Sequence, residues 1–244
     1  MATTILTHTT ALRKREQIAE GTIAFHFEKP AGFEFRAGQF LDWTLINPPE
    51  TDAEGNTRAF SIVSAPFESD VAIATRMRDT AFKRVLRSMP LGTEVKIDGP
   101  SGSFTLHKNS AKPAVFLAGG IGITPFVSMV RQAAHDRLPH QLYLFYSNHR
   151  PEDAPFLNDL ADLTKLNPNF HLVATMTEMS KSSLPWNGER GFIDREMLSK
   201  NIPDLQGPIY YIAGPPAMVA AMRQVLTQAA VDEDDIRTEE FAGY

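Results

Sequence analysis

The sequence predicts a two-domain protein, in which an antiparallel β-barrel of Greek-key type is followed by an α/β domain built on a parallel sheet. Two observations lead to this fold class. From Ile5 to about Phe104, short strand-like segments separated by turns surround one short helix. From Val115 onwards, strand-like segments alternate with helical ones, which is typical of a parallel sheet with right-handed crossovers. The chain has 244 residues, enough for two domains with hydrophobic cores.

The composition excludes several classes of protein. Lys plus Arg is 24 and Asp plus Glu is 29, so the net charge of −5 argues against nucleic acid as the main partner, although a local basic patch could serve phosphates or an acidic protein. There are no cysteines, which excludes disulfides, cysteine-ligated iron–sulfur clusters and cysteine-based zinc sites carried by this chain. The seven histidines are scattered and form no metal-ligand spacing, so we expect no metal site.

The sequence also bears on location. No apolar run approaches the roughly 20 residues of a membrane span. The first residues lack the basic and then apolar pattern of a signal peptide. We therefore expect a cytoplasmic protein without a membrane span.

The first half of the chain reads as barrel strands with one helix. The helix is expected from Ala81 to about Met89, because Phe82, Val85 and Leu86 fall on one of its faces. The strands, each bounded by turn residues, are Thr22–Phe27, Gln39–Ile46, Phe60–Val63, Val71–Arg76 and Glu94–Ile97.

The polar segment His107–Pro113 separates this half from the second, so we predict a first domain of residues 1–108 and a second of residues 112–244. The expected strands of the second domain are Val115–Ala118, Gln141–Tyr146, His171–Met176 and Pro208–Ala213. The expected helices begin at Pro125 and cover 153–166, 194–200 and 215–230. Loops at the carboxyl edge of such a sheet form its ligand site.

A glycine turn joins the first of these strands to its helix. Gly119, Gly120 and Gly122 follow four apolar residues, and Pro125 suits the first turn of a helix. Such a turn leaves backbone N–H groups at a helix N-terminus, which is a site for a pyrophosphate. The alternative is an ordinary strand-to-helix turn, because the spacing differs from the Rossmann Gly-x-Gly-x-x-Gly pattern.

A second unusual segment lies in the first half. Arg58-Ala59-Phe60-Ser61 places a guanidinium, an aromatic ring and a hydroxyl within four residues. On an extended strand, Arg58 and Phe60 share a face and Ser61 points the other way unless the strand twists or bulges. The alternative is an ordinary strand with a surface arginine and a core phenylalanine.

Arg58-Ala-Phe-Ser61 resembles the Arg-x-Tyr-Ser flavin motif of the ferredoxin–NADP reductase superfamily. Further segments are similar to segments of that family in the same order and spacing, and together they cover nearly the whole chain. They are Gly38-Gln-Phe40, Gly99-Pro-Ser-Gly-Ser-Phe104, Gly119-Gly-Ile-Gly-Ile-Thr-Pro125 and Ala213-Gly-Pro-Pro-Ala-Met218. The ordered set is more specific than any of its motifs.

The resemblance implies that the barrel binds FAD. Arg58 would pair with the flavin pyrophosphate, Phe60 would lie against the isoalloxazine ring in place of the usual tyrosine, and Ser61 would hydrogen-bond near flavin N5. A hydroxyl suits that position because it can donate to oxidised N5 and accept from reduced N5–H. A second flavin segment, where helix-start amides and a cation would hold phosphates, is implied at Arg76, Met77, Arg78, Ala81, Phe82 and Lys83.

The resemblance implies NAD(P)H as the ligand of the second domain, held by Gly119, Gly120, Gly122, Thr124, Gly214, Pro215 and Met218. The loop after the second strand, with Ser147, Asn148 and Arg150, would select the nucleotide. It has no acidic residue before Glu152, which favours NADPH over NADH, and Arg190 is a second candidate cation. Ala213 replaces the family's usual cysteine, which bears on the rate of hydride transfer.

The tail Thr238–Tyr244 resembles the aromatic C-terminus of several family members. We expect Phe241 or Tyr244 to cover the flavin ring or the nucleotide site until NAD(P)H displaces it. Glu240, or its neighbour Glu239, would hydrogen-bond Ser61 or relay a proton. The predicted catalytic residues are thus Ser61, Phe241 and Glu240, and the alternative is a frayed acidic end.

Taken together, the resemblance implies a flavoprotein oxidoreductase that transfers hydride between NAD(P)H and bound FAD. Electrons would pass to or from a separate acceptor, such as a ferredoxin, a flavodoxin or an oxygenase component. Two alternatives stay open, an NAD(P)H-dependent reductase of free flavin and a non-catalytic nucleotide-binding redox sensor. The choice between FAD and FMN, and the identity of the acceptor, also stay open.

Overall fold

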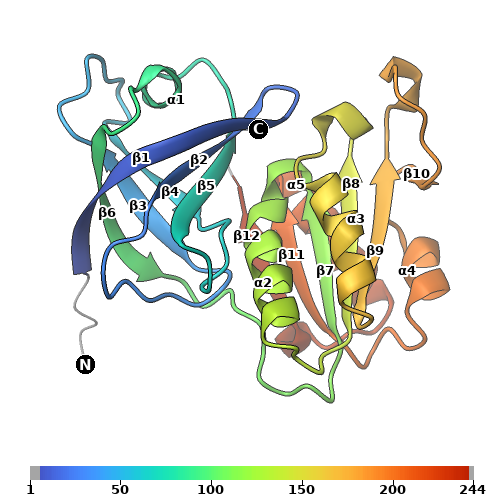
Figure 1. The fold of residues 1–244 in the computed structure, drawn as a ribbon. Helices are drawn as coiled ribbons and strands as arrows, with labels where there is room; N and C mark the ends of the chain where they lie inside the picture. Colours follow the sequence, from blue (N-terminus) through green and yellow to red (C-terminus); the bar gives the residue numbers. More distant parts are fainter. Residues whose placement is uncertain (1–5, 242–244) are drawn as a thin grey trace.

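The computed structural model describes residues 6–241 as two domains that lie side by side (Figure 1). Each domain is built on one six-stranded sheet. The first sheet is antiparallel and the second is parallel, so the predicted fold class is confirmed.

The first sheet has the strand order β4-β3-β6-β1-β2-β5 and curls into a barrel. Beyond β4, the backbone N–H of Val63 donates to the carbonyl of Ala72 in β5 at 2.8 Å, which brings the two edge strands together. The strands are β1 (Leu6–Ala19), β2 (Thr22–Glu28), β3 (Phe40–Leu45), β4 (Thr57–Ser61), β5 (Asp70–Arg76) and β6 (Glu94–Ser101).

The helix α1 (Ala81–Ser88) closes one end of the barrel (Figure 1). Its N-cap is Thr80, whose side chain accepts a hydrogen bond from the N–H of Lys83. Its buried residues, Phe82, Val85 and Leu86 among them, pack against the barrel core. This is the face that the sequence predicts.

The second sheet has the order β10-β9-β8-β7-β11-β12, and every strand of it is parallel to its neighbours. All six residues of β7 are buried, because helices cover both faces of the sheet. The strands are β7 (Ala114–Gly119), β8 (Leu142–Asn148), β9 (Phe170–Met176), β10 (Glu189–Arg190), β11 (Ile209–Gly214) and β12 (Ile236–Glu240).

Helices α2 (Thr124–His135) and α3 (Leu157–Leu166) pack on one face of this sheet, and α4 (Arg195–Asn201) and α5 (Pro216–Gln228) pack on the other (Figure 1). Short 3-10 turns cover Gly120–Ile123, Pro151–Asp153, Met179–Lys181 and Glu233–Asp235. The chain leaves β7 towards β8 and later returns to place β11 on the other side of β7. This reversal of strand order is where α/β sheets bind ligands.

Several segments differ from the sequence prediction. The strand β4 covers Thr57–Ser61 rather than Phe60–Val63, and the two-residue strand β10 was not expected. The strand β1 was not expected; it pairs with β6 through residues 6–11 and with β2 through residues 12–19. The helix α3 begins at Leu157 rather than at Asp153, because Pro155 and the left-handed Phe156 (φ 61°) precede it. The sequence indicates a docked or frayed end in this part of the chain and no strand. The structure has the strand β12 there, and it pairs with β11 along its whole length.

A hydrogen-bonded cluster fixes the linker between the domains. The hydroxyl oxygen of Tyr211 accepts hydrogen bonds from the backbone N–H of His107 (2.8 Å) and from Nη1 of Arg237 (3.0 Å). Nε2 of His107 lies 2.9 Å from the carbonyl of Lys112, which can only accept, so Nε2 carries the proton. Nδ1 therefore accepts from the Tyr211 hydroxyl at 3.0 Å. Burial lowers the pKa of His107, in keeping with this neutral form.

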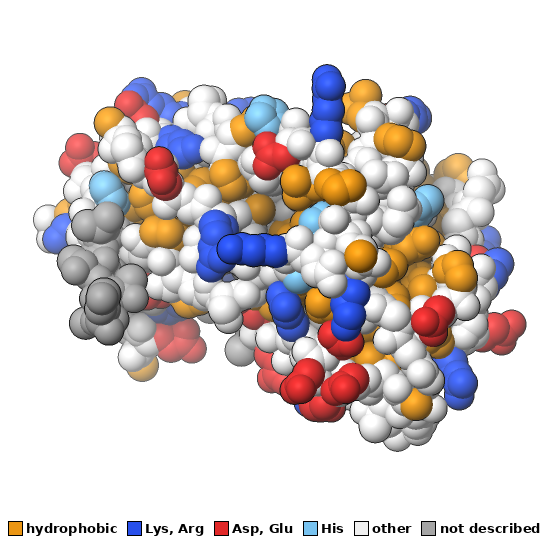
Figure 2. All heavy atoms as spheres, turned by 90° about the horizontal axis from the view of Figure 1, so that it is seen from below, with side chains coloured by type: hydrophobic (Ala, Val, Ile, Leu, Met, Phe, Trp, Pro, Cys, Tyr) orange, Lys and Arg blue, Asp and Glu red, His pale blue; other side chains and the backbone are white. Residues whose placement is uncertain are grey.

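The surface seen from below the view of Figure 1 carries charges of both signs, with hydrophobic patches between them (Figure 2). Within the part of the chain that the structure describes, no helix has the length and apolar character needed to cross a membrane. The same residues contain no group of three or more His, Cys, Asp or Glu side chains that could hold a metal ion.

Candidate functional site

Two cavities of similar size meet at the cleft between the domains. The first, here called the barrel cavity, has a volume of about 440 Å³ and is lined by Glu54, Arg58, Ala59, Phe60, Ser61, Ala74, Thr75, Arg76, Arg78, Thr80, Phe82, Lys83, Ile121, Thr124 and Phe241. The second, here called the sheet cavity, has a volume of about 430 Å³ and is lined by Arg76, Gly119, Gly120, Ser147, Asn148, His149, Thr177, Phe192, Ile193, Pro215, Ala217, Met218, Ala221, Met222 and Val225.

All four residues of the Arg58–Ser61 segment line the barrel cavity. Ser61, at the end of β4, is 6% exposed, and Phe60 packs beside Phe82 of α1 with ring centroids 5.8 Å apart. The guanidinium of Arg58 lies over the Phe82 ring, 5.4 Å from its centroid. The strand and the helix together therefore present aromatic surface, a cation and a hydroxyl to one space.

In this structure, carboxylates of the loop before β4 engage Arg58. Its Nη2 lies 3.0 Å from the carboxylate of Asp52 and 2.9 Å from that of Glu54. Asp52 also accepts the N–H of Ala81, at the N-terminus of α1, at 3.2 Å. The Asp52 carboxylate thus bridges Arg58 and the N–H of Ala81, the two groups that the resemblance assigns to a flavin phosphate. This corner of the cavity therefore attracts anions.

The remaining residues of the second predicted segment divide between cavity and core. Arg78 and Lys83 line the barrel cavity, whereas Met77 packs against the barrel core. Burial lowers the pKa of Lys83, and the nearby charges of Arg78 and Arg58 lower it further. An anion bound among these three cations would relieve that repulsion.

The glycine turn after β7 forms one wall of the sheet cavity. A Cβ on Gly119 would lie 2.3 Å from Sδ of Met218, and a Cβ on Gly122 would lie 2.3 Å from the carbonyl oxygen of Ala213. The loops that follow β7 and β11 therefore interlock, and only glycine permits this approach. Gly119, Gly120, Pro215 and Met218 line the cavity, while Gly122 and Gly214 support it from behind.

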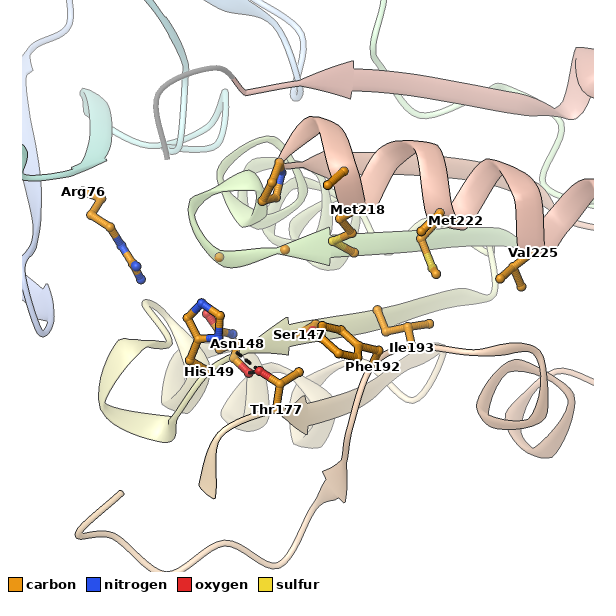
Figure 3. Close-up of a pocket in the computed structure, with 15 residues that line it drawn as sticks. Arg76, Ser147, Asn148, His149, Thr177, Phe192, Ile193, Met218, Met222 and Val225 are labelled. Atoms are coloured by element: carbon orange, nitrogen blue, oxygen red, sulfur yellow. Dashed lines mark hydrogen bonds between the residues drawn. The ribbon is translucent and has the colours of Figure 1, made fainter. Parts of the chain in front are cut away.

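Apolar side chains form the other end of the sheet cavity (Figure 3). They come from α5 and from the segment after β10, and Phe192 is 77% exposed although it lines the cavity. Of this wall the sequence analysis predicted Met218 and missed the other members, which are Phe192, Ile193, Met222 and Val225. An exposed aromatic beside a buried apolar wall is the usual lining for a flat ring such as a nucleobase.

Polar side chains lie where β8 and β9 end (Figure 3). Ser147, Asn148, His149 and Thr177 all line the sheet cavity, and Nδ1 of His149 lies 3.1 Å from the Thr177 hydroxyl. Asn148 is 6% exposed, and neither its amide nitrogen nor its amide oxygen has a hydrogen-bond partner. Buried amides are normally paired, so these atoms mark a place for a ligand.

The structure does not bring Arg150 to this cavity. Its guanidinium binds both carboxylate oxygens of Asp153 at 2.8 Å and the carboxylate of Glu20, in the β1–β2 turn, at 2.8 Å. Arg190 lies exposed on β10 and lines neither cavity. Two of the residues on which the predicted NADPH preference depends are thus directed elsewhere.

Arg76, at the end of β5, lines both cavities and joins them. Its Nε is buried without a hydrogen-bond partner, and its Nη2 lies 3.5 Å from the carbonyl of Asp153. Thr124 and Phe241 extend from the second domain to line the barrel cavity, and the Thr124 hydroxyl donates to the carbonyl of Ile121 at 3.1 Å. Each domain therefore contributes to the other's cavity.

The two acids of the tail differ in their surroundings. Glu240 is exposed and lines neither cavity, whereas Oε2 of Glu239 is buried without a hydrogen-bond partner. Burial raises the pKa of Glu239 to about 7. Glu239 is thus the buried acid of the tail and Glu240 the exposed one, and neither lines a cavity. Tyr244 lies outside the described residues.

Comparisons with known proteins agree with this geometry. Residues 116–224 match the family model described as the oxidoreductase NAD-binding domain. The whole fold superposes on a ferredoxin NADP+ reductase from Neisseria gonorrhoeae with bound FAD and NADP, with a TM-score of 0.78 and 22% identity over 96% of this chain and 98% of that one. The whole chain therefore has the fold of a ferredoxin NADP+ reductase. The resemblance seen in the sequence is thereby confirmed.

Other reductases are also similar to this chain. The Amycolatopsis cytochrome P450 reductase GcoB gives a TM-score of 0.82 at 21% identity, over 97% of this chain and 70% of that one. The glycine betaine monooxygenase reductase subunit of Chromohalobacter salexigens is 28% identical over 224 residues, and the reductase component of propane 2-monooxygenase from Rhodococcus jostii is 27% identical over 217 residues. The chain covers 60% and 57% of the lengths of these last two proteins.

Proposed function

We propose that this chain is a flavin-dependent NAD(P)H oxidoreductase, with FAD in the barrel cavity and NAD(P)H in the sheet cavity. One observation carries the proposal: the two cavities share Arg76 as a wall, so ligands held in them would be neighbours. Bound FAD would accept hydride from the nicotinamide and release electrons to a second molecule. The protein's part is binding, orientation and electrostatics.

The residues present fit both cofactors. In the barrel cavity, Arg58, Arg78 and Lys83 offer positive charge to a pyrophosphate, and Phe60 offers a flat apolar surface to a ring. In the sheet cavity, the unpaired amide of Asn148 can donate a hydrogen bond to NAD(P)H and accept one from it. Both cavities are large enough for the part of a dinucleotide that they would hold.

Three side chains have roles in this proposal beyond holding a cofactor. The hydroxyl of Ser61 can either donate or accept a hydrogen bond, so it can serve a ring nitrogen in either protonation state. Glu239 can hold or release a proton near neutral pH, because burial raises its pKa to about 7. Phe241 lines the barrel cavity from the second domain and would limit access to it until a nucleotide enters.

We propose a protein acceptor, because the curated relatives named above are reductase subunits or components of oxygenases. No cysteine is present to hold an iron–sulfur cluster on this chain, so a ferredoxin, a flavodoxin or an oxygenase component would take the electrons. The cytoplasmic location expected from the sequence stays a prediction within this proposal.

An absorbance spectrum of the purified protein, recorded before and after anaerobic addition of NADH or NADPH, tests the proposal. We expect a bound flavin whose absorbance bleaches on reduction. A colourless protein that reduces added flavin would instead be a reductase of free flavin. Bound flavin that neither nucleotide bleaches would contradict the oxidoreductase proposal and favour the redox sensor.

A further inference from the structure

The end of the sheet cavity that would receive the adenosine ribose is lined by neutral polar groups. Ser147 and Asn148 end β8, His149 follows it, and Thr177 follows β9. In doubly wound sheets, the loop after the second strand reads the ribose next to the adenine. A hydroxyl, an amide and an imidazole can exchange hydrogen bonds with a ribose diol, and the unpaired amide of Asn148 has both a donor and an acceptor to offer.

The arginines near this end of the sheet cavity are either paired with carboxylates or lie towards the barrel cavity. Arg150 is held by Asp153 and Glu20, so its charge is already neutralised. Of the described residues that line the sheet cavity, Arg76 alone is a lysine or an arginine. Arg76 also lines the barrel cavity, so it lies at the flavin end, where the pyrophosphate common to NADH and NADPH would pass.

A carboxylate stands beside the neutral groups. Oε1 of Glu178 lies 3.9 Å from Nδ1 of His149, and the backbone N–H of Glu178 donates to the carbonyl of His149 at 2.8 Å. Lys181 binds the Glu178 side chain at 2.7 Å and lowers the pKa of Glu178, so this side chain stays ionised at neutral pH. The ionised Glu178 carboxylate, paired with Lys181, thus lies one residue beyond Thr177, which lines the cavity.

We propose that this oxidoreductase uses NADH in preference to NADPH, and that Asn148 and Glu178 set the preference. The inference rests on the proposed function. The 2′-phosphate of NADPH carries a charge of about −1.5 to −2 near neutral pH. At this end the described lining residues offer it no lysine or arginine, and the nearby Lys181 is already paired with the Glu178 carboxylate. The two free ribose hydroxyls of NADH carry no such charge and match the neutral groups. This reverses the NADPH preference expected from Arg150 in the sequence.

Anaerobic stopped-flow reduction of the holoenzyme, with NADH and NADPH in parallel, measures the preference. We expect the ratio of the reduction rate to the nucleotide dissociation constant to be at least about tenfold higher for NADH. Equal ratios, or a higher ratio for NADPH, would overturn the inference. Titration calorimetry of NAD+ and NADP+ binding gives the same comparison without turnover.

Two matched variants locate the source of the preference. Glu178→Gln removes this negative charge and should raise the affinity for NADPH about three- to tenfold, with little change for NADH. Glu189→Gln is the control, because Glu189 is also paired with a lysine and has almost the same exposed fraction, 37% against 38%, but lies away from the cavity. An equal effect of both variants, or none from Glu178→Gln, would contradict the assignment.

A third variant tests the amide. Asn148→Ala should weaken NADH binding at least about fivefold, while the flavin content and the circular dichroism spectrum stay unchanged. Unaltered NADH binding in a folded protein would remove Asn148 from the site. The outcomes separate the two proposals: if neither nucleotide bleaches the flavin and neither binds, the proposed function fails, whereas efficient bleaching with a preference for NADPH refutes only the present inference.

Discussion

Glu239 is a buried carboxylic acid whose protonation departs from its ordinary behaviour. Oε2 of its carboxyl group is buried without a partner, and burial raises its pKa from 4.5 to about 7. By strand alternation it shares a face of β12 with Arg237 and Phe241, which contact the barrel domain. A carboxyl group that titrates near neutral pH beside the cleft can exchange protons under working conditions.

Replacing Glu239 by Gln should change how stability depends on pH. The unfolded chain loses this proton near pH 4.5 and the folded protein keeps it to about pH 7, so this group makes stability fall as pH rises between those values. Glu239→Gln should remove that fall and stabilise the apoprotein at pH 8 by up to about 3 kcal/mol. Urea unfolding at pH 5 and pH 8 measures the difference. The exposed Glu240, changed to Gln, is the control, and parallel pH profiles for all three proteins would contradict the assignment.

Side-chain partners that are distant in sequence limit prediction at this scale. The residues of the Arg58–Ser61 segment line a cavity, as the motif implies. The engagement of Arg150 by Glu20 joins residues 130 positions apart, and nothing local to either residue signals it. The exposed Phe192 was likewise missed, because a lone aromatic after a glycine carries no pattern. The sequence thus indicates motif residues that meet at one cavity, whereas it does not indicate which of their charges are already paired.

Among the elements, the linker is fixed more firmly than its polar sequence indicates. His107 and Arg237 both donate to the hydroxyl of Tyr211 in β11, so the linker, β11 and β12 are joined at one atom. The ring of Tyr211 also packs edge-on against Phe104 at the end of the barrel, with centroids 5.5 Å apart. This cluster positions the two domains relative to each other.

Changing Tyr211 to Phe should loosen that junction. The backbone N–H of His107 and the Arg237 guanidinium would lose a buried acceptor, which costs about 1 to 3 kcal/mol of stability. Chemical unfolding measures the loss. Tyr143→Phe is the control, because the ring of Tyr143 stacks on His171 at the other side of the sheet. A Tyr211→Phe protein as stable as the wild type would show that water replaces the hydroxyl.

Strands with a regular apolar pattern were predictable, and two strands without one were not. The strand β1 bends as it passes from β6 to β2, which leaves the side chains in its middle at the surface. The middle can therefore be charged, and it consists of Arg13, Lys14, Arg15 and Glu16. The strand β12 has the sequence Ile-Arg-Thr-Glu-Glu, whose hydrogen bonds to β11 hold it in place. In both strands, backbone pairing outweighs side-chain pattern.

At the scale of the whole molecule, the cleft depends on a residue from each domain reaching the other. Arg76 extends from the barrel to the sheet cavity, and Phe241 extends from the end of β12 to the barrel cavity. Phe241 is held there by the hydrogen bond from its N–H to the carbonyl of Gly214 at 3.0 Å. The two cavities therefore form one composite site only when the domains are docked.

Phe241→Ala should make that site easier to enter. If the ring covers the position of the nicotinamide, part of the protein is closed to the nucleotide at any moment. Removal of the ring should then tighten nucleotide binding about two- to tenfold, because all molecules become open. Phe192→Ala removes a wall of the sheet cavity and should weaken binding instead. Fluorescence titration of the bound flavin with each nucleotide measures both changes. Identical dissociation constants for Phe241→Ala and the wild type would refute the lid.

The order of the domains and their fold class were predictable because each follows from a repeated local pattern and from the ordered set of motifs. The way in which the domains meet was not, since it depends on packing between residues such as Phe104 and Tyr211. The predicted domain limits, 1–108 and 112–244, remain predictions.

The strand β12 has a practical consequence for anyone who handles this protein. Its register with β11 carries the chain directly to Phe241, a wall of the barrel cavity. A purification tag fused after residue 244 would start four positions after Phe241, close in sequence to that wall. Recombinant material should therefore carry its tag at the opposite terminus, where the chain leads into β1.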